Sequence, residues 1–228
     1  VLVGGFGIIF RRSMLDLPNI GCVNMHSSLL PKHRGPNPFC AVILTGEQES
    51  GVTFHIMEEK IDAGDILEQA SFPLTPEDTP YSVHAKSCAL AADLVIPVMD
   101  HIQAEGLHGI PQDASHATYD KKPTQADACI HWDASAEQIE RQVRALRSIH
   151  SPWFSHRGKT VHVTQVNVDY DDSNTAPGTV LSNKPYVRIA VRSGAVNIVS
   201  AYTTGAIPFP WPMPWHRPNT GESLMACE

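Results

Sequence analysis

The sequence predicts an α/β unit followed by a small β-barrel, and three patterns along its 228 residues support that fold class. Short apolar runs at 2–5 and 21–23 end at turn-forming or polar residues, as buried strands do. Residues 81–105 carry apolar side chains at helical spacing. After Trp153, short alternating runs are separated by turn residues, which is typical of a small barrel.

The first half of the chain is expected to alternate strands with helices. Besides the two apolar runs at its start, strands are predicted at 51–57 and 66–72, and helices at 38–45 and 81–105. The shorter helix opens with a proline and is followed by Gly46, and Gly106 ends the longer one. Pro97 should bend the longer helix.

The second half should contain one helix and four strands. Ser135 is a suitable N-cap with Gln138 three residues on, so a helix is predicted from Ser135 to Arg147. The predicted strands cover 160–168, 178–181, 187–191 and 196–202. Residues 207–218 alternate proline with aromatic and other side chains, which excludes a helix or a central strand. This tail should lie extended against the barrel, where it could also recognise a partner.

The first candidate catalytic residues stand at the end of the run at 21–23. Asn24 and His26 are two positions apart, so their side chains should share one face at the carboxyl end of a strand. Ligands of open α/β sheets bind just outside such ends. An amide N–H can hold a developing oxyanion and an imidazole can stabilise it or move a proton, which suits acyl chemistry. Ordinary turn chemistry would place the same residue types there.

Asp62 is the third candidate. It follows the predicted strand at 51–57 and is flanked by glycine and a second aspartate, so a loop could turn its carboxylate toward His26. The apolar side chains of that strand alternate, which puts His55 on the opposite face, where a surface position is expected. The loop at 28–36 is too rich in special residues to be a solvent linker.

Three segments resemble the 10-formyltetrahydrofolate-dependent formyltransferases. They read N-M-H-S-S-L-L-P-K-H-R-G-P from Asn24, G-V-T-F-H-I-M from Gly51 and I-D-A-G-D-I-L from Ile61. The family includes the methionyl-tRNA, glycinamide ribonucleotide and amino-sugar formyltransferases. Its catalytic Asn, His and Asp have the spacing of Asn24, His26 and Asp62. Residues 117–141 look most like the start of the C-terminal domain of the methionyl-tRNA enzymes.

The resemblance implies a two-domain architecture. Residues 1–105 would be the later part of a catalytic domain with a Rossmann-like parallel sheet, whose first strands precede this sequence. Residues 106–130 would be a linker, and residues 131–228 an open, OB-like barrel. A first strand that needs neighbours on both edges would leave this chain alone poorly folded or weak in folate binding.

The resemblance also implies the chemistry. The formyl donor 10-formyltetrahydrofolate would bind against a set of seven residues, Gly7, Ile8, Ile9, Ser28, Leu29, Leu30 and Pro31. An unprotonated primary amine would attack the formyl carbon while Asn24 and His26 stabilise the oxyanion. Asp62 would orient the imidazole, and either His26 or Asp62 would pass the amine proton to the leaving nitrogen. The twelve histidines show no metal-ligand spacing, so no metal is predicted.

The acceptor amine is the open part of the functional prediction. Methionyl-tRNA leads narrowly, ahead of a nucleotide-linked amino sugar or a carrier-bound amino acid. The net charge is −7, with −8 in residues 1–119 and +1 in residues 120–228, whereas a nucleic-acid binder usually shows a basic face. The sequence Lys32-His33-Arg34 also departs from the tRNA enzymes, which often have an aromatic residue before the arginine. A hydrolase that passes formyl to water and a folate-binding scaffold without turnover are the other hypotheses.

Composition indicates the compartment. Five cysteines are scattered without a C-x-x-C pair, which argues against a disulfide framework or a zinc site and favours a reducing cytosol. There is no signal-peptide pattern and no apolar run of about 18 residues, so neither secretion nor a membrane span is predicted. A cytoplasmic protein without membrane partners is expected, and the sequence does not address its oligomeric state.

Overall fold

The computed structural model describes residues 1–170, 174–203, 218–225 and 227. By its internal contacts the chain divides into two compact units, Val1–Lys122 (unit 1) and Pro123–Glu228 (unit 2). The proline-rich tail predicted at 207–218 lies outside the described residues except for Pro218. Each unit is described below by itself.

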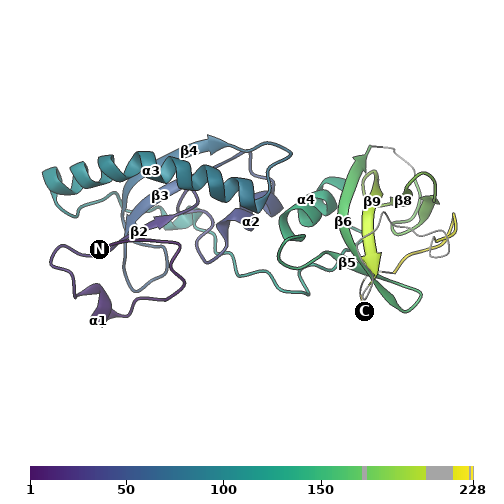
Figure 1. The fold of residues 1–228 in the computed structure, drawn as a ribbon, viewed down its shortest axis with the longest axis horizontal. Helices are drawn as coiled ribbons and strands as arrows, with labels where there is room; N and C mark the ends of the chain where they lie inside the picture. The colour runs from purple at the N-terminus through teal and green to yellow at the C-terminus, as the bar shows by residue number, and fades with distance from the viewer. Residues whose placement is uncertain (171–173, 204–217, 226, 228) are drawn as a thin grey trace. The chain divides into compact units, whose positions relative to one another are not determined.

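Unit 1 is a four-stranded sheet with helices (Figure 1). The strands are β1 (Leu2–Gly4), β2 (Val23–His26), β3 (Glu49–Ile56) and β4 (Ile66–Pro73), hydrogen-bonded in that order, and the helices are α1 (Arg12–Leu15), α2 (Pro38–Thr45) and α3 (Pro80–Glu105) with the short 3-10 turn η1 (Ala114–His116). The α/β class is confirmed. The sheet is mixed rather than parallel, because only the β1–β2 pair is parallel. The nine-residue connection between β3 and β4 suits an antiparallel pair, since parallel crossovers need about a dozen residues or more.

One strand prediction needs correction and one is confirmed. The run at 2–5 was expected to be buried, but β1 pairs with β2 alone among the described strands, and Leu2 is 44% exposed. Asn24 and His26 were expected at the carboxyl end of a strand. They lie there, two positions apart in the last three residues of β2, and β3 pairs with both of them, at His55 and Thr53.

Helix α3 lies across the sheet of unit 1, as Figure 1 shows, and contacts β3 and β4. Ala91 and Val98 belong to the core cluster of unit 1 together with residues of β2, β3 and β4, and Val83 near the start of the helix is also buried. Length and composition alone would let α3 cross a membrane, with a mean hydropathy of 1.2 over 18 residues, where the sequence analysis expected no such run. Core helices often meet the same two conditions, and α3 packs one side against β3 and β4, while Ile96 and Met99 are 64% and 50% exposed.

Unit 2 is a five-stranded antiparallel sheet covered by one helix (Figure 1). The strands are β5 (Trp153–His156), β6 (Lys159–Asp169), β7 (Val180–Ser182), β8 (Val187–Ala190) and β9 (Ala195–Thr203), in the order β5-β6-β9-β8-β7, and the helix is α4 (Ala136–Leu146). The predicted capping box is present, since Ser135 and Gln138 each bond the other's backbone N–H. The sequence analysis missed β5, a four-residue strand whose hairpin partner follows after Arg157-Gly158. Both of these turn residues have positive φ, as type I′ hairpin turns require.

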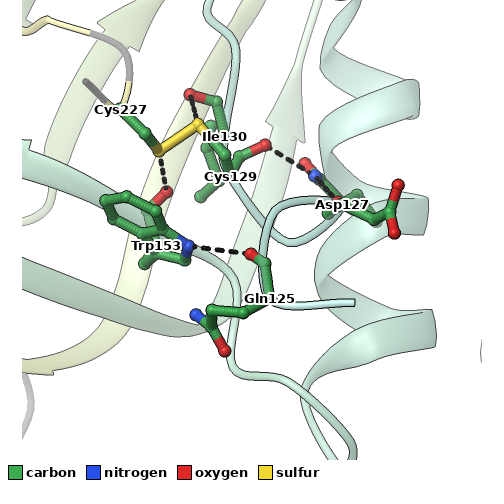
Figure 2. Close-up of a disulfide and its surroundings, with 7 residues drawn as sticks. Gln125, Asp127, Cys129, Ile130, Trp153 and Cys227 are labelled. Carbon is green, nitrogen blue, oxygen red and sulfur yellow. Dashed lines mark hydrogen bonds between the residues drawn. A yellow bond between two sulfur atoms is a disulfide. The ribbon is translucent and has the colours of Figure 1, made fainter. Parts of the chain in front are cut away.

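The end of the chain returns to unit 2 and is tied there by a disulfide. Ser223 bridges Thr179 next to β7, and Met225 bridges Ser155 in β5, so the segment contacts both edges of the open sheet. Cys227 then bonds to Cys129, 98 residues earlier, with the two Cα atoms 5.9 Å apart (Figure 2). The prediction that the cysteines form no disulfide is therefore wrong. Two cysteines this far apart in sequence carry no local signal, and only the fold brings them together.

Candidate active site

The three predicted catalytic residues come together at one place in unit 1. The His26 Nδ1 atom lies 3.6 Å from Oδ2 of Asp62. The Asn24 Nδ2 atom lies 3.2 Å from Nε2 of His55, and the same His55 nitrogen lies 3.6 Å from Oδ1 of Asp62. His26, His55 and Asp62 have side-chain exposures of 7%, 2% and 13%, so this is a nearly water-free polar cluster.

His55 is the fourth member of the cluster, and the expectation of a surface position for it is wrong. Six consecutive residues of β3, at 50–55, are buried, so side chains on both of its faces are covered. The loop after β2 covers the face of His55: Thr53 donates to the Ser28 carbonyl and accepts from the Leu30 N–H, and Leu29 packs over Gly51. Alternation along β3 identified two faces but could not show that a distant loop covers the second one.

His26 is held as a neutral imidazole with one nitrogen free to accept a proton. Its Nε2 lies 2.8 Å from the carbonyl oxygen of His33, and because a carbonyl can only accept, Nε2 carries the hydrogen. Nδ1 is left facing Asp62. Burial lowers the pKa of His26, and the charge of Asp62 only partly opposes this. The ring is therefore an unprotonated base at neutral pH, beside a carboxylate that would stabilise its charged form.

Asp62 is kept ionised despite its burial. Burial raises its pKa, but the neighbouring rings of His55 and His26 and the Gly35 N–H, which donates to Oδ2 at 2.8 Å, together lower it below its usual value. Its backbone has a φ of 51°, in the left-handed region, which turns the carboxylate back toward β2.

A glutamine from the predicted linker braces the Asp62 loop. Gln112 donates from Nε2 to the carbonyl oxygens of Asp62 and Gly64, at 3.0 and 2.7 Å. Its Oε1 accepts two bonds from the guanidinium of Arg34, which is 2% exposed and also donates to the Tyr119 hydroxyl at 2.7 Å. All four hydrogen-bonding positions of this amide are used. A lone glutamine in a stretch without periodicity gives no sequence signal for such a role.

The same stretch pairs with the loop that follows His26. Tyr119 forms a parallel bridge with Arg34, and the Thr118 carbonyl accepts from the Arg34 N–H. Asp120 accepts a hydrogen bond from, or forms an ion pair with, Nδ1 of His33 at 2.8 Å. Residues 112–120 thus contact both the loop that follows His26 and the loop that carries Asp62.

The predicted folate-binding residues fall into two groups. The polar atoms of the 28–31 segment mostly bond within unit 1; Ser28, for instance, donates its hydroxyl to the Lys32 carbonyl. Gly7, Ile8 and Ile9 follow β1, and the two isoleucines are 61% and 66% exposed. Because β1 and β2 are parallel, this segment leaves the sheet at the same end as Asn24 and His26. No described contact joins it to the catalytic candidates.

Two further features bear on ligands. A cavity of about 240 Å³ is lined by Leu29, Pro31 and His33 among others, but by none of Asn24, His26 and Asp62. Among the described residues, no group of three or more His, Cys, Asp or Glu side chains could hold a metal ion.

Comparison with known proteins gives consistent matches along the chain. Residues 1–99 match the family model described as "Formyl transferase", and residues 122–210 match "Formyl transferase, C-terminal domain". The chain is 31% identical to a methionyl-tRNA formyltransferase of Hydrogenovibrio crunogenus over 226 residues, which is 98% of this chain and 72% of that protein.

Solved structures share the fold at lower identity. HypX from Aquifex aeolicus, in complex with tetrahydrofolic acid, is 23% identical with a TM-score of 0.59, and the match covers 83% of this chain. The chain spans about a third of the length of HypX, at 34%. An N-formyltransferase from Helicobacter canadensis, in complex with folinic acid and dTDP-3-aminofucose, is 21% identical with a TM-score of 0.66, covering 86% of this chain and 71% of that one.

Proposed function

Because this chain belongs to the formyl transferase family, we propose that it transfers a formyl group from 10-formyltetrahydrofolate to a primary amine. The observation that carries the proposal is the pair of His26 and Asp62, a neutral buried base whose free nitrogen lies 3.6 Å from an ionised carboxylate. Asn24, two residues away on the same face of β2, adds an amide donor. Acyl transfer to an amine requires these groups: a proton acceptor, a counter-charge for it and an oxyanion donor.

Each residue then has one task in the reaction. As the amine attacks the formyl carbon, an Asn24 N–H stabilises the negative oxygen that forms. The Nδ1 atom of His26 takes the proton that the amine loses, and Asp62 stabilises the resulting imidazolium. His26 then returns this proton to the leaving nitrogen of the folate. The geometry favours His26 over Asp62 as the proton carrier, because Oδ2 of Asp62 already accepts from Gly35.

We propose that the folate donor binds at the end of β1 and β2. Ile8 and Ile9 expose apolar surface there, which fits a flat heteroaromatic ring, and Gly7 lets that ring approach the backbone. Residues 28–31 would form the opposite wall. Their internal bonds to Thr53 and Gln69 hold this wall rigid, so it would present backbone and the Leu29 side chain rather than the Ser28 hydroxyl.

Methionyl-tRNA is the proposed acceptor by a narrow margin, supported by the 31% identity to the Hydrogenovibrio crunogenus enzyme. An amino sugar or a carrier-bound amino acid is the second candidate, favoured by the net charge of −7. A hydrolase using the same residues would release formate without any amine. The protein is proposed to act in the cytoplasm, where folate donors and charged tRNA occur.

The test is a competition assay with the formyl donor and each acceptor at equal concentration. Formylation of charged initiator tRNA that falls tenfold or more between roughly 50 and 200 mM salt would support the tRNA assignment. Salt-insensitive formylation of a small amine, with no tRNA product, would overturn it. Formate release that is independent of any amine would replace the transferase by a hydrolase.

A further inference from the structure

We propose that His55 is a positioning residue that orients the amide of Asn24 for catalysis and separates it from the Asp62 carboxylate. This inference rests on the proposed function, because it assigns Asn24 the task of oxyanion donor. His55 is 2% exposed and lies opposite Asn24 in the β2–β3 register. Its Nε2 atom faces Asn24 and Asp62, and we infer that it acts on the reaction through these two residues rather than by touching the substrate.

The hydrogen bonds of His55 determine its tautomer. Its Nδ1 lies 2.9 Å from the carbonyl oxygen of Ile56, and since a carbonyl only accepts, Nδ1 carries the hydrogen. Nε2 lies 3.2 Å from the Asn24 amide nitrogen, and because that nitrogen can only donate, Nε2 accepts the hydrogen bond. This hydrogen bond can therefore form in only one orientation of the Asn24 amide, with its NH₂ group toward His55.

That orientation matters because the NH₂ group of an amide donates hydrogen bonds to a negative oxygen, whereas its carbonyl oxygen repels one. With the NH₂ group held by His55 through one hydrogen, the second N–H of the same nitrogen remains for the oxyanion. If the amide rotated by half a turn, its carbonyl oxygen would face the oxyanion and repel it. Asn24 is only partly buried, so packing alone does not fix the rotation of its amide. The contact with His55 is the described hydrogen bond that does.

The position of Asp62 gives His55 a second constraint. Nε2 lies 3.6 Å from Oδ1 of Asp62, whereas Oδ2 faces His26 and the Gly35 N–H. A ring nitrogen cannot accept and donate a hydrogen bond at once. If Nε2 carried a hydrogen, it would lose the hydrogen bond from Asn24 and could donate one to Oδ1 of Asp62 instead. While Nε2 accepts from Asn24, His55 therefore donates nothing to Asp62, whose Oδ2 faces His26.

A purely structural role would not need an imidazole. The other face of β3 packs Val52 and Phe54 in the core, and a leucine would fill the space of His55. What leucine cannot supply is an acceptor for Asn24. Glutamine can, because its Oε1 reaches a similar position.

The experiment compares His55→Leu with His55→Gln in the full chain, with His116→Leu, an exposed histidine, as control. His55→Leu should lower kcat by about tenfold or more with KM for donor and acceptor within about threefold, and His55→Gln should recover most of it. In an Asn24→Ala background, His55→Leu should have less than about a twofold further effect, because its partner is gone. Two results would overturn the proposal. One is an unchanged kcat in His55→Leu; the other is a fall in kcat on adding His55→Leu to Asn24→Ala that equals the fall in the otherwise unaltered protein.

A second measurement keeps the inference testable if His55→Leu does not fold or if no acceptor turns over. The ¹⁵N chemical shifts of the His55 ring and the Asn24 side chain in the unaltered protein report the hydrogen bond directly. An unprotonated Nε2, and an Asn24 NH₂ signal that moves in His55→Gln but not in His116→Leu, support the inference even if transfer activity is absent. A protonated Nε2 at neutral pH would overturn it while leaving the proposed function intact.

Discussion

The two units of this chain are similar in size but fill their interiors differently. Seventeen buried apolar residues form the core cluster of unit 2, against six in unit 1. Of the described side chains that are buried and polar or charged, ten lie in unit 1 and only His156 lies in unit 2. Several of the polar residues buried in unit 1, such as His26, Arg34 and His55, hold the candidate site, whereas the described interior of unit 2 is mainly apolar and is closed by a disulfide.

The difference indicates that activity and stability can be changed separately. Buried polar networks are costly unless every partner is present, and they persist where function requires them. Changes in unit 1 should therefore alter catalysis first, and changes in unit 2 should alter unfolding. All four tryptophans, Trp132, Trp153, Trp211 and Trp215, belong to unit 2, so tryptophan fluorescence follows that unit alone.

The largest effect is expected at the catalytic residues of unit 1. Asn24→Ala, His26→Ala and Asp62→Ala should each lower kcat/KM about 10²-fold or more, since oxyanion and proton-transfer groups typically contribute about 3–4 kcal/mol. The fluorescence-detected unfolding of unit 2 should not change. Near-normal turnover in any folded variant would remove that residue from the mechanism.

The disulfide should be the strongest single contribution to unit 2. Cys129→Ser should lower the free energy of unfolding by about 2–4 kcal/mol, because the bond closes a long loop in the unfolded chain. Denaturant titration by tryptophan fluorescence measures this, and Cys88→Ser, which changes a free exposed cysteine, is the control. Equal midpoints with and without a thiol reductant would contradict the bond, and formyl transfer should survive the substitution.

Gln112 couples stability to activity within unit 1. Gln112→Leu should cost about 1–3 kcal/mol, because it leaves donors of the buried Arg34 guanidinium without an acceptor. It should also reduce kcat, since the Asp62 loop loses two hydrogen bonds. Far-UV circular dichroism and turnover measure both effects, and Gln103→Leu on the exposed side of α3 is the control. A stable variant with full activity would show that the brace is dispensable.

Asp78 should make the helix α3 terminus sensitive to acid. Its carboxylate accepts from the Thr75 N–H, the Ser82 hydroxyl and the Lys86 ammonium. Burial opposes these bonds, which nevertheless lower the pKa of Asp78 from 3.8 to about 2. A carboxylate whose pKa is lowered by folding stabilises the fold above pH 3.8, and this stabilisation is lost as the pH falls toward 2. Asp78→Asn should therefore lower the free energy of unfolding by about 1–2 kcal/mol at pH 7.

The control for this prediction is Asp93→Asn, on an exposed part of the same helix. Circular dichroism melts at pH 7 and pH 3 should show the Asp78→Asn deficit shrinking with acid. A deficit that stays constant with pH would mean that the shape of the side chain, not its charge, stabilises this terminus.

The smallest effect concerns the pH profile of transfer. Because burial lowers the pKa of His26 below 6.5, its base form persists into mildly acidic solution. At saturating substrates, kcat should change by less than about twofold between pH 8 and 6.5 and decline only below that range. An acid limb centred above pH 6.5 would contradict the neutral buried imidazole.

Much of the secondary structure could be predicted from the sequence, and so could the three candidate catalytic residues that the fold brings together. Helix α2 was predicted at its observed bounds, because proline at its start and Gly46 after its end are local signals. The capping box of α4 and most strands of unit 2 were predicted for the same reason. The grouping of Asn24, His26 and Asp62 followed from the family spacing, and in the fold His26 and Asp62 lie 3.6 Å apart while Asn24 contacts His55.

What the sequence alone determined is local: helix caps, turn residues, strand alternation and the residue types of an acyl-transfer site. Tertiary structure decided which surfaces are covered. It buried His55 under the loop after β2, placed Gln112 against Asp62 and joined Cys129 to Cys227. The physical reason is that capping and alternation act over a few residues, whereas burial and long-range bonding depend on segments far apart in the chain.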